Sequence, residues 1–141
     1  MKTTNLVEYF EKINYDWNKD LKPLTSICML TKTRVDKTKK SGEMSYGSEQ
    51  CFLVKSIANH IGASTFFEIG TGRGTACYSV ALEEEIEEII TVDIVSHFHK
   101  KNEAIAYQPV QVSNHELYQM VEGQEKEKIS FKHRSELPLI I

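Results

Sequence analysis

The chain has 141 residues, of which 40% are hydrophobic and 26% are charged, and its formal net charge is −3. These values are ordinary for a single soluble globular domain, and they exclude a global electrostatic attraction to nucleic acid or to an anionic membrane. No apolar run approaches the length of a membrane span, and the N-terminus lacks the apolar region of a signal peptide. We therefore expect a cytoplasmic protein with no membrane contact.

The first expected element is an amphipathic helix. Apolar side chains recur at steps of three and four residues over 6–17, and Thr4 or Asn5 can serve as the N-cap. Over 21–46 the pattern dissolves into Thr, Lys, Ser and Gly, which predicts a long connection. We therefore interpret residues 1–45 as a helical N-terminal extension followed by a basic flexible loop.

The basic loop occupies residues 31–42. Its positive charge would allow contact with the phosphates of a nucleic acid, but it lacks the interleaved aromatic side chains that stack on bases. A solvated surface loop is therefore the favoured interpretation, and nucleic acid is not the favoured partner. The basic residues are Lys32, Arg34, Lys37, Lys39 and Lys40, opposed by Asp36.

A second helix is expected over 48–62, with Ser48 as its N-cap and Gly62 at its C-terminal end. Its expected apolar face consists of Phe52, Leu53, Ile57 and Ile61.

Short apolar runs then alternate with helical patterns, which predicts an α/β fold with a buried parallel sheet and right-handed crossovers. The acidic run EEEIEE at the end of the first of these helices predicts a solvated surface. The expected strands are 65–69, 88–93 and 128–133, and the expected helices are 75–88 and 114–122.

Three cysteines, Cys28, Cys51 and Cys77, are widely spaced and form no CxxC pair. This spacing argues against a disulfide framework and against a zinc site, so we expect reduced and mostly buried thiols. His97 and His99 form an HxH pattern, but loop histidines are usually not ligands, and no metal site is predicted.

The strand at 65–69 runs directly into a glycine-rich turn. Gly70, Gly72 and Gly74 form a GxGxG pattern, and glycines permit a tight turn and close approach of a ligand to backbone N–H groups. Asp93 closes the next strand, where an acid can bind ribose hydroxyls. The two strand ends are adjacent in a parallel sheet, so the sequence predicts a nucleotide-type site.

The spacing separates the candidate ligands. The dinucleotide pattern GxGxxG requires a glycine at the position of Thr75, and no GK[ST] phosphate loop follows the turn. Glu68 precedes the first glycine, where its carboxylate would repel a pyrophosphate and favour a cationic group. The turn therefore favours a ligand that is positive near the glycines over a dinucleotide oxidoreductase cofactor.

These residues resemble a known family. FFEIGTGRG is similar to motif I of the class I S-adenosylmethionine-dependent methyltransferases, and ITVDIV is similar to the acidic strand end that follows it. The resemblance covers 46–141 and implies a Rossmann-like sheet that binds S-adenosylmethionine. It implies that Gly70, Gly72 and Gly74 pack against the methionine and ribose, that Glu68 meets the amino-acid end, that Asp93 holds the ribose hydroxyls and that Glu136 contacts adenine.

The resemblance also implies what the chain lacks. Family members place their acceptor-binding and catalytic residues mostly after the third strand, and this sequence ends soon after its third strand. We expect an incomplete sheet, and three explanations stay open: a fragment of a longer enzyme, completion of the sheet by dimerisation, or cover from the N-terminal extension. Tyr46, Glu49 and His97 are catalytic candidates by location only, and the methyl acceptor is unassigned.

Two functions are compatible with these residues. The first is an S-adenosylmethionine-dependent methyltransferase, or the cofactor-binding part of one. The alternative is a non-catalytic interaction or regulatory protein that acts through its unfinished sheet edge, where an unpaired strand invites a second chain and thus a homo-oligomer.

Overall fold

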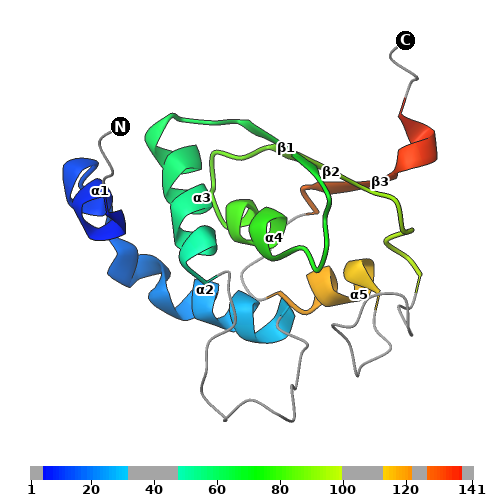
Figure 1. Cartoon of the computed structure of the whole chain (residues 1–141), viewed down its shortest axis with the longest axis horizontal. Coiled ribbons are helices and arrows are strands. Elements are labelled where there is room, and N and C mark those ends of the chain that lie inside the picture. Colours follow the sequence, from blue (N-terminus) through cyan, green and yellow to red (C-terminus); the bar gives the residue numbers. More distant parts are fainter. Residues whose placement is uncertain (1–4, 32–47, 100–112, 122–126, 138–141) are drawn as a thin grey trace.

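The computed structural model describes residues 5–31, 48–99, 113–121 and 127–137. In these residues the chain is an α/β protein with a parallel sheet of three strands, in the order β1-β2-β3, and flanking helices (Figure 1). The elements are α1 (Leu6–Lys12), α2 (Trp17–Thr31), α3 (Ser48–His60), β1 (Thr65–Ile69), α4 (Thr75–Ala81), β2 (Glu88–Asp93), α5 (Asn114–Gln119), β3 (Ile129–His133) and a 3₁₀ turn, Arg134–Glu136.

One face of the sheet forms the core. The register aligns Phe66 of β1 with Ile89 of β2 and Ile89 with Ile129 of β3, and all three belong to the core or pack against it. Further along this face the ring of Phe131 lies 6.0 Å from that of Tyr118 on α5. Residues that pair in a parallel sheet point to the same face, so α4 and α5 cover this side.

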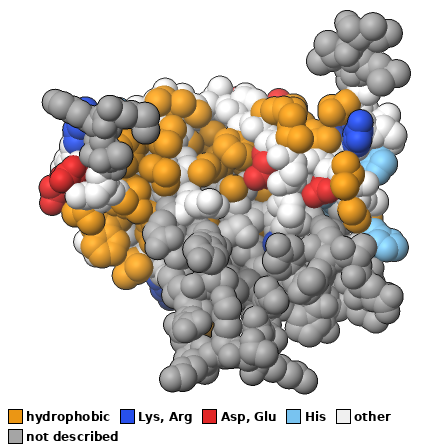
Figure 2. Space-filling model, in the orientation of Figure 1, with side chains coloured by type: hydrophobic (Ala, Val, Ile, Leu, Met, Phe, Trp, Pro, Cys, Tyr) orange, Lys and Arg blue, Asp and Glu red, His pale blue; other side chains and the backbone are white. Residues whose placement is uncertain are grey.

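The opposite face of β1 is open in the described part of the chain. Phe67 and Ile69 are 54% and 77% exposed, and burial alternates along the strand. Figure 2 shows hydrophobic side chains gathered over the region where Figure 1 places β1 and β2. The expectation of a strand buried on both faces was therefore wrong for β1, because the described helices cover only one face and β1 lies at an edge of the sheet.

The N-terminal region differs most from expectation. The side-chain oxygen of Asn5 accepts a hydrogen bond from the backbone N–H of Glu8 at 2.9 Å, which confirms Asn5 as the N-cap. The expectation of one helix through Trp17 was wrong, since Asn14 adopts a left-handed conformation with φ of 53° and a new helix begins at Trp17.

The long connection expected from residue 21 was also wrong, because α2 continues to Thr31 with Pro23 inside it. Leu24, Ile27 and Thr31 are buried at spacings of three and four residues, and α2 packs against α3 and α4. Tertiary burial outweighs the weak helix propensity of this segment. The remainder of the expected basic loop, from residue 32, lies outside the described residues.

The end of α3 confirms the role of Gly62. Its φ is 60°, its N–H donates to Asn59 O at 3.0 Å, and Ala63 N–H donates to Ala58 O at 2.9 Å, which is a Schellman motif. The expected apolar face was partly wrong, because Ile57 and Ile61 are 41% and 67% exposed. The helix instead buries Cys51, Lys55, Ser56 and Ala58.

Helix α4 is shorter than expected and ends at Ala81 rather than near residue 88. The acidic run that follows is not uniformly solvated, since Glu83 is only 8% exposed and Ile86 is fully buried. The other strand and helix positions in this half of the chain are confirmed to within a few residues. None of the helices in the described part of the chain has the length and apolarity that crossing a bilayer requires.

Candidate functional site

The glycine turn lies at the carboxyl end of β1. The backbone φ angles of Gly70, Gly72 and Gly74 are 89°, 56° and 83°. Residues other than glycine rarely adopt these values. The backbone N–H of Gly70 donates to Val92 O at 2.7 Å, and that of Gly74 donates to Thr71 O at 2.8 Å. The turn is thus tied to β2 at its start and closed on itself at its end.

The three glycines differ in what surrounds them. A Cβ atom at Gly70 or Gly72 would meet nothing within 4 Å, whereas one at Gly74 would lie 2.2 Å from the ring of Tyr78. Gly74 therefore serves internal packing, because it makes room for Tyr78. Gly70 and Gly72 leave open space at the strand end, which a ligand could use.

Asp93 ends β2 and reaches the turn. One of its carboxylate oxygens accepts from the backbone N–H of Gly72 at 3.1 Å, and the other accepts from the N–H of Val95 at 3.2 Å. A carboxylate oxygen has two lone-pair sites, so each oxygen can still accept one further hydrogen bond. The structure therefore brings the predicted Gly72 and Asp93 together with acceptor capacity left over.

Glu68 lies on β1, two residues before the first glycine of the turn. Thr91 Oγ1 donates to its carboxylate at 2.8 Å and stands 2.6 Å from Thr71 Oγ1. Because the Thr91 proton is already used, Thr71 is the donor in that second contact. Burial raises the pKa of Glu68 and nearby Asp93 adds to this, while hydrogen bonds from Thr91 and Cys77 oppose it.

Sequence reasoning missed Asn114. This residue begins α5, is fully buried, and donates through its side-chain nitrogen to Gly72 O at 3.0 Å. The Tyr78 hydroxyl donates to Asn114 O at 2.6 Å, so α4, α5 and the turn meet here. A polar residue at the expected start of a helix was the only sequence signal, and it is too common to identify a site.

His97 is buried, and its Nδ1 lies 3.3 Å from the side-chain nitrogen of Asn114. It is 1% exposed, its Nε2 lies 3.1 Å from Lys132 O, and its ring lies 5.0 Å from that of Phe131. His99 is exposed. The residues that the structure describes contain no group of three His, Cys, Asp or Glu side chains arranged to hold a metal ion.

Glu136 lies apart from the turn in the strand order, at the end of β3 with β2 between β3 and β1. Its carboxylate accepts from the backbone N–H of His133 at 2.8 Å and caps the 3₁₀ turn. The structure therefore does not bring Glu136 into contact with the glycines. Tyr46 and the side chain of Glu49 lie outside the described residues.

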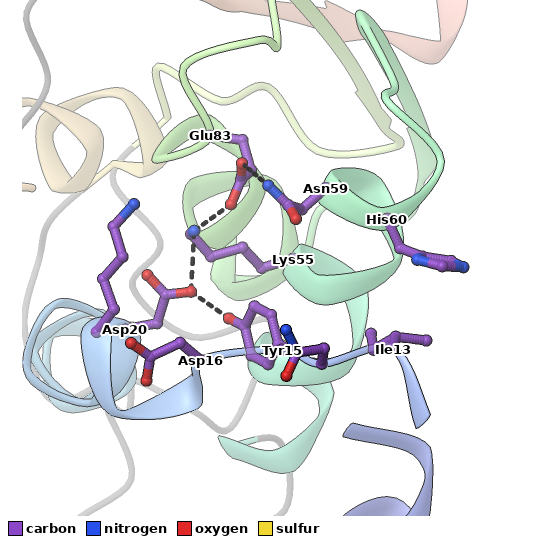
Figure 3. A pocket seen from close by; sticks show the side chains of 10 residues that line it. Ile13, Tyr15, Asp16, Asp20, Lys55, Asn59, His60 and Glu83 are labelled. Atoms are coloured by element: carbon purple, nitrogen blue, oxygen red, sulfur yellow. Dashed lines mark hydrogen bonds and ion pairs between the residues drawn. The ribbon is translucent and has the colours of Figure 1, made fainter. Parts of the chain in front are cut away.

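A second set of buried polar side chains lines a cavity of about 200 Å³. The cavity lies between the α1–α2 junction, α3 and the residues after α4 (Figure 3). Lys55 Nζ lies 3.0 Å from an Asp20 oxygen and also pairs with Glu83. The Tyr15 hydroxyl donates to Asp20, and Asn59 donates to Glu83 at 3.0 Å. We call Tyr15, Asp20, Lys55, Asn59 and Glu83 the lysine cluster.

The lysine cluster has the features of a structural network. Burial and the neighbouring Asp20 raise the pKa of Tyr15, so its hydroxyl stays protonated and remains a donor. Glu83 lies beyond the C-terminal end of α4, whereas the glycine turn precedes its N-terminal end. The cluster thus joins α2, α3 and the end of α4 at a place separated from the turn by the helix, about 10 Å long.

Comparisons with protein-family models, with curated proteins and with solved structures give no match. A functional interpretation of this chain therefore rests on its own residues and their geometry.

Proposed function

We propose that the chain binds S-adenosylmethionine at the glycine turn and that its sheet is a Rossmann-like sheet of the methyltransferase type. On this proposal the protein is an S-adenosylmethionine-dependent methyltransferase or the cofactor-binding part of one. The observation that carries the proposal is the contact between Gly72 and Asp93, because it joins the turn to the acid at the adjacent strand end.

The arrangement supports an adenosine-type ligand. In parallel sheets such ligands bind outside the carboxyl ends of the strands, where the turn and Asp93 lie. The remaining acceptor sites of Asp93 can take the two ribose hydroxyls. Open space at Gly70 and Gly72 lets the backbone approach the ligand closely.

The carboxylates of Glu68 and Asp93 favour a ligand that carries a cationic group beside them. The Gly72 N–H is already bonded to Asp93 and so is poorly placed to bind a pyrophosphate. Glu68, held near the turn with a raised pKa, would be stabilised in its charged form by a nearby sulfonium or ammonium group. Methyl transfer from a sulfonium depends largely on positioning of the reactants, so a binding site of this kind needs few catalytic side chains.

The test is a calorimetric titration of the 141-residue chain with S-adenosylmethionine and, in parallel, with NADH. We expect saturable binding of the first ligand alone. Asp93→Ala should lower the affinity about tenfold or more, because hydrogen bonds to a charged acceptor are lost, and should leave the circular dichroism spectrum unchanged. Asp16→Ala, which changes an exposed acid near the lysine cluster, is the matched control. Equal affinity in the Asp93 variant would remove the ribose role.

A second candidate function is association through the sheet edge, in a homo-oligomer or a regulatory complex. The observation that favours it is the exposure of Phe67 and Ile69 on edge strand β1. Sedimentation should then show a dimer for the wild type and a monomer for Phe67→Lys. A wild type that is monomeric at high concentration would rule out self-association through this edge.

A further inference from the structure

Arg73 stands in the middle of the glycine turn, and no described residue pairs with its charge. All three nitrogen atoms of its guanidinium are buried, and none has a hydrogen-bond partner in the described part of the chain. Buried arginine is ordinarily paired, since an isolated buried charge is strongly unfavourable. This residue is therefore an exception that calls for an anion.

The neighbouring carboxylates do not supply that anion. Asp93 is bonded to the backbone N–H groups of Gly72 and Val95, and Glu68 is bonded to Thr91. Neither carboxylate has a hydrogen bond or ion pair with Arg73 among the described residues.

Arg73 lies two residues before Thr75, the first residue of α4. Tyr78 of α4 is close enough to contribute to the pKa of Arg73, and the Tyr78 hydroxyl is bonded to the backbone of Asn114. Burial lowers the pKa of Arg73 to about 10, which still leaves it charged at neutral pH. The side-chain oxygen of Asn114 is also buried without a partner among the residues described, and the nitrogen of the same side chain donates to the carbonyl oxygen of Gly72, the residue before Arg73.

We propose that Arg73 is the anchor of an anion site beside the glycine turn, which takes a carboxylate or phosphate group. A guanidinium presents paired N–H donors that match both groups. Because the Asn114 oxygen also lacks a partner among the described residues, a hydroxylated acid is included among the probes below. The assignment of this anion to a substrate rests on the proposed function, whereas the anion site itself does not.

The primary experiment is thermal unfolding of the wild type in phosphate, in acetate and in L-malate, each compared with chloride at equal ionic strength. We expect a concentration-dependent rise in Tm with at least one of these anions. Arg73→Met should abolish that rise, Arg73→Lys should keep part of it, and Arg134→Met, which changes an exposed arginine, should keep all of it.

The unfolding temperatures measured in chloride alone provide an independent test. In chloride alone, Arg73→Met should unfold at the same or a higher temperature than the wild type, because methionine replaces a buried unpaired charge and keeps much of the apolar stem. A lower Tm in chloride, together with no anion-specific rise in the wild type, would show that Arg73 is satisfied within the protein. That result would overturn the proposal.

Two sources of the anion are distinguished by titration with S-adenosylmethionine and its decarboxylated analogue. If the cofactor's own carboxylate occupies the site, Arg73→Met weakens only the binding of S-adenosylmethionine, and phosphate competes with it. If the anion belongs to another ligand, both compounds bind the variant as they bind the wild type, and phosphate adds its stabilisation to theirs. Anion-dependent stabilisation without any S-adenosylmethionine binding would refute the proposed function while leaving the anion site in place.

A separate observation concerns two cysteines. Cys28 of α2 and Cys51 of α3 have their sulfur atoms 3.4 Å apart. Cys28 is partly exposed, and Cys51 is fully buried. The hydrogen bond with Cys28 lowers the pKa of Cys51 to about 7 against the opposing effect of burial, and Ser79 lowers it further.

We also propose that Cys28 and Cys51 form an oxidisable pair for which hydrogen peroxide is a sufficient oxidant. The thiolate of the pair attacks one peroxide oxygen, the O–O bond breaks, and the hydroxide released takes a proton and leaves as water. The second sulfur attacks the resulting sulfenic sulfur, and its proton leaves with the hydroxyl as a second water. The sulfur atoms must approach to about 2.05 Å to form the bond.

The cysteine pair lies close to Thr75, the residue that follows the last glycine of the turn. Cys51 Sγ is 4.0 Å from the carbonyl oxygen of Thr75, the first residue of α4, and Thr75 Oγ1 donates to Thr31 of α2 at 2.8 Å. Closing the disulfide therefore draws α2 and α3 together at the base of α4, and a change in ligand affinity is the expected consequence.

The test is intact-mass measurement after peroxide treatment of the folded chain. We expect the loss of two hydrogen atoms in the wild type and in Cys77→Ser, and no such loss in Cys28→Ser or Cys51→Ser. Oxygen addition on separate cysteines without a disulfide would refute the pair. Binding of S-adenosylmethionine before and after oxidation then measures the coupling to the turn.

Discussion

Two buried polar regions lie at opposite ends of α4, and they differ in how completely their groups are paired. In the lysine cluster, Lys55 contacts two carboxylates, and Tyr15 and Asn59 each donate to one of them. At the glycine turn, the guanidinium nitrogens of Arg73 and the side-chain oxygen of Asn114 are buried without partners in the described residues. A complete network supports the fold, whereas unmet groups beside open glycines indicate a place for a ligand.

The largest effect that tests this comparison is expected at Lys55. Lys55→Met leaves the carboxylates of Asp20 and Glu83 buried without their cation, and breaking a buried pair in this way costs about 3–5 kcal/mol of unfolding free energy. Urea unfolding measures the loss. Lys19→Met, which removes an exposed lysine from the same cavity, should change stability by less than about 1 kcal/mol. A similar small change at Lys55 would mean that the cluster is hydrated rather than buried.

The glycines of the turn provide the next test. Gly74→Ala combines a left-handed φ with a clash against Tyr78, for an expected loss of about 2–5 kcal/mol. Gly70→Ala has the strained φ but no clash, so we expect about 1–2 kcal/mol. Thermal or urea unfolding ranks the two variants. For S-adenosylmethionine affinity we expect the opposite order. Gly70→Ala should lose more affinity than Gly74→Ala, because the added methyl group at Gly70 fills the space proposed for the ligand. Equal stability losses would contradict the packing role of Gly74.

The smallest expected effect is the pH dependence that Glu68 contributes. Burial raises its pKa above the ordinary value of 4.5, so the folded state binds this proton more tightly than the unfolded chain. The resulting stability is present at low pH and falls as the pH rises from about 4.5 toward the higher folded-state pKa. Glu68→Gln removes this titration, and its stability relative to the wild type should therefore improve as the pH rises above about 4.5. Glu84→Gln, at an exposed position, is the control, and a parallel profile for both variants would refute the shift.

The parts of the fold that sequence reasoning located well share a local cause. Short apolar runs bounded by turn residues identified β1, β2 and β3, and Gly62 marked the end of α3 because a left-handed Schellman position favours glycine. The turn after β1 followed from the same conformational argument. These features depend on neighbours in sequence, so a single chain is sufficient to indicate them.

The errors share a different cause. The break at Asn14, the length of α2 through Pro23 and the burial of Glu83 each depend on contacts with segments distant in sequence. Lys55 was unremarkable in the sequence, and it became the centre of a network only when α2 and the residues after α4 packed around it. Helix propensity and hydrophobic spacing contain no information about such partners.

The features of the candidate site show the same difference between local and long-range causes. The sequence by itself determined the glycine turn and the acid at the next strand end, because backbone conformation and strand alternation are local properties. Only the tertiary structure decided that Asp93 bonds to Gly72, that Asn114 donates to the turn, and that the guanidinium nitrogens of Arg73 are buried without a partner among the described residues. Pairing and burial are properties of the assembled chain, since the desolvation of a charge depends on every segment that packs around it.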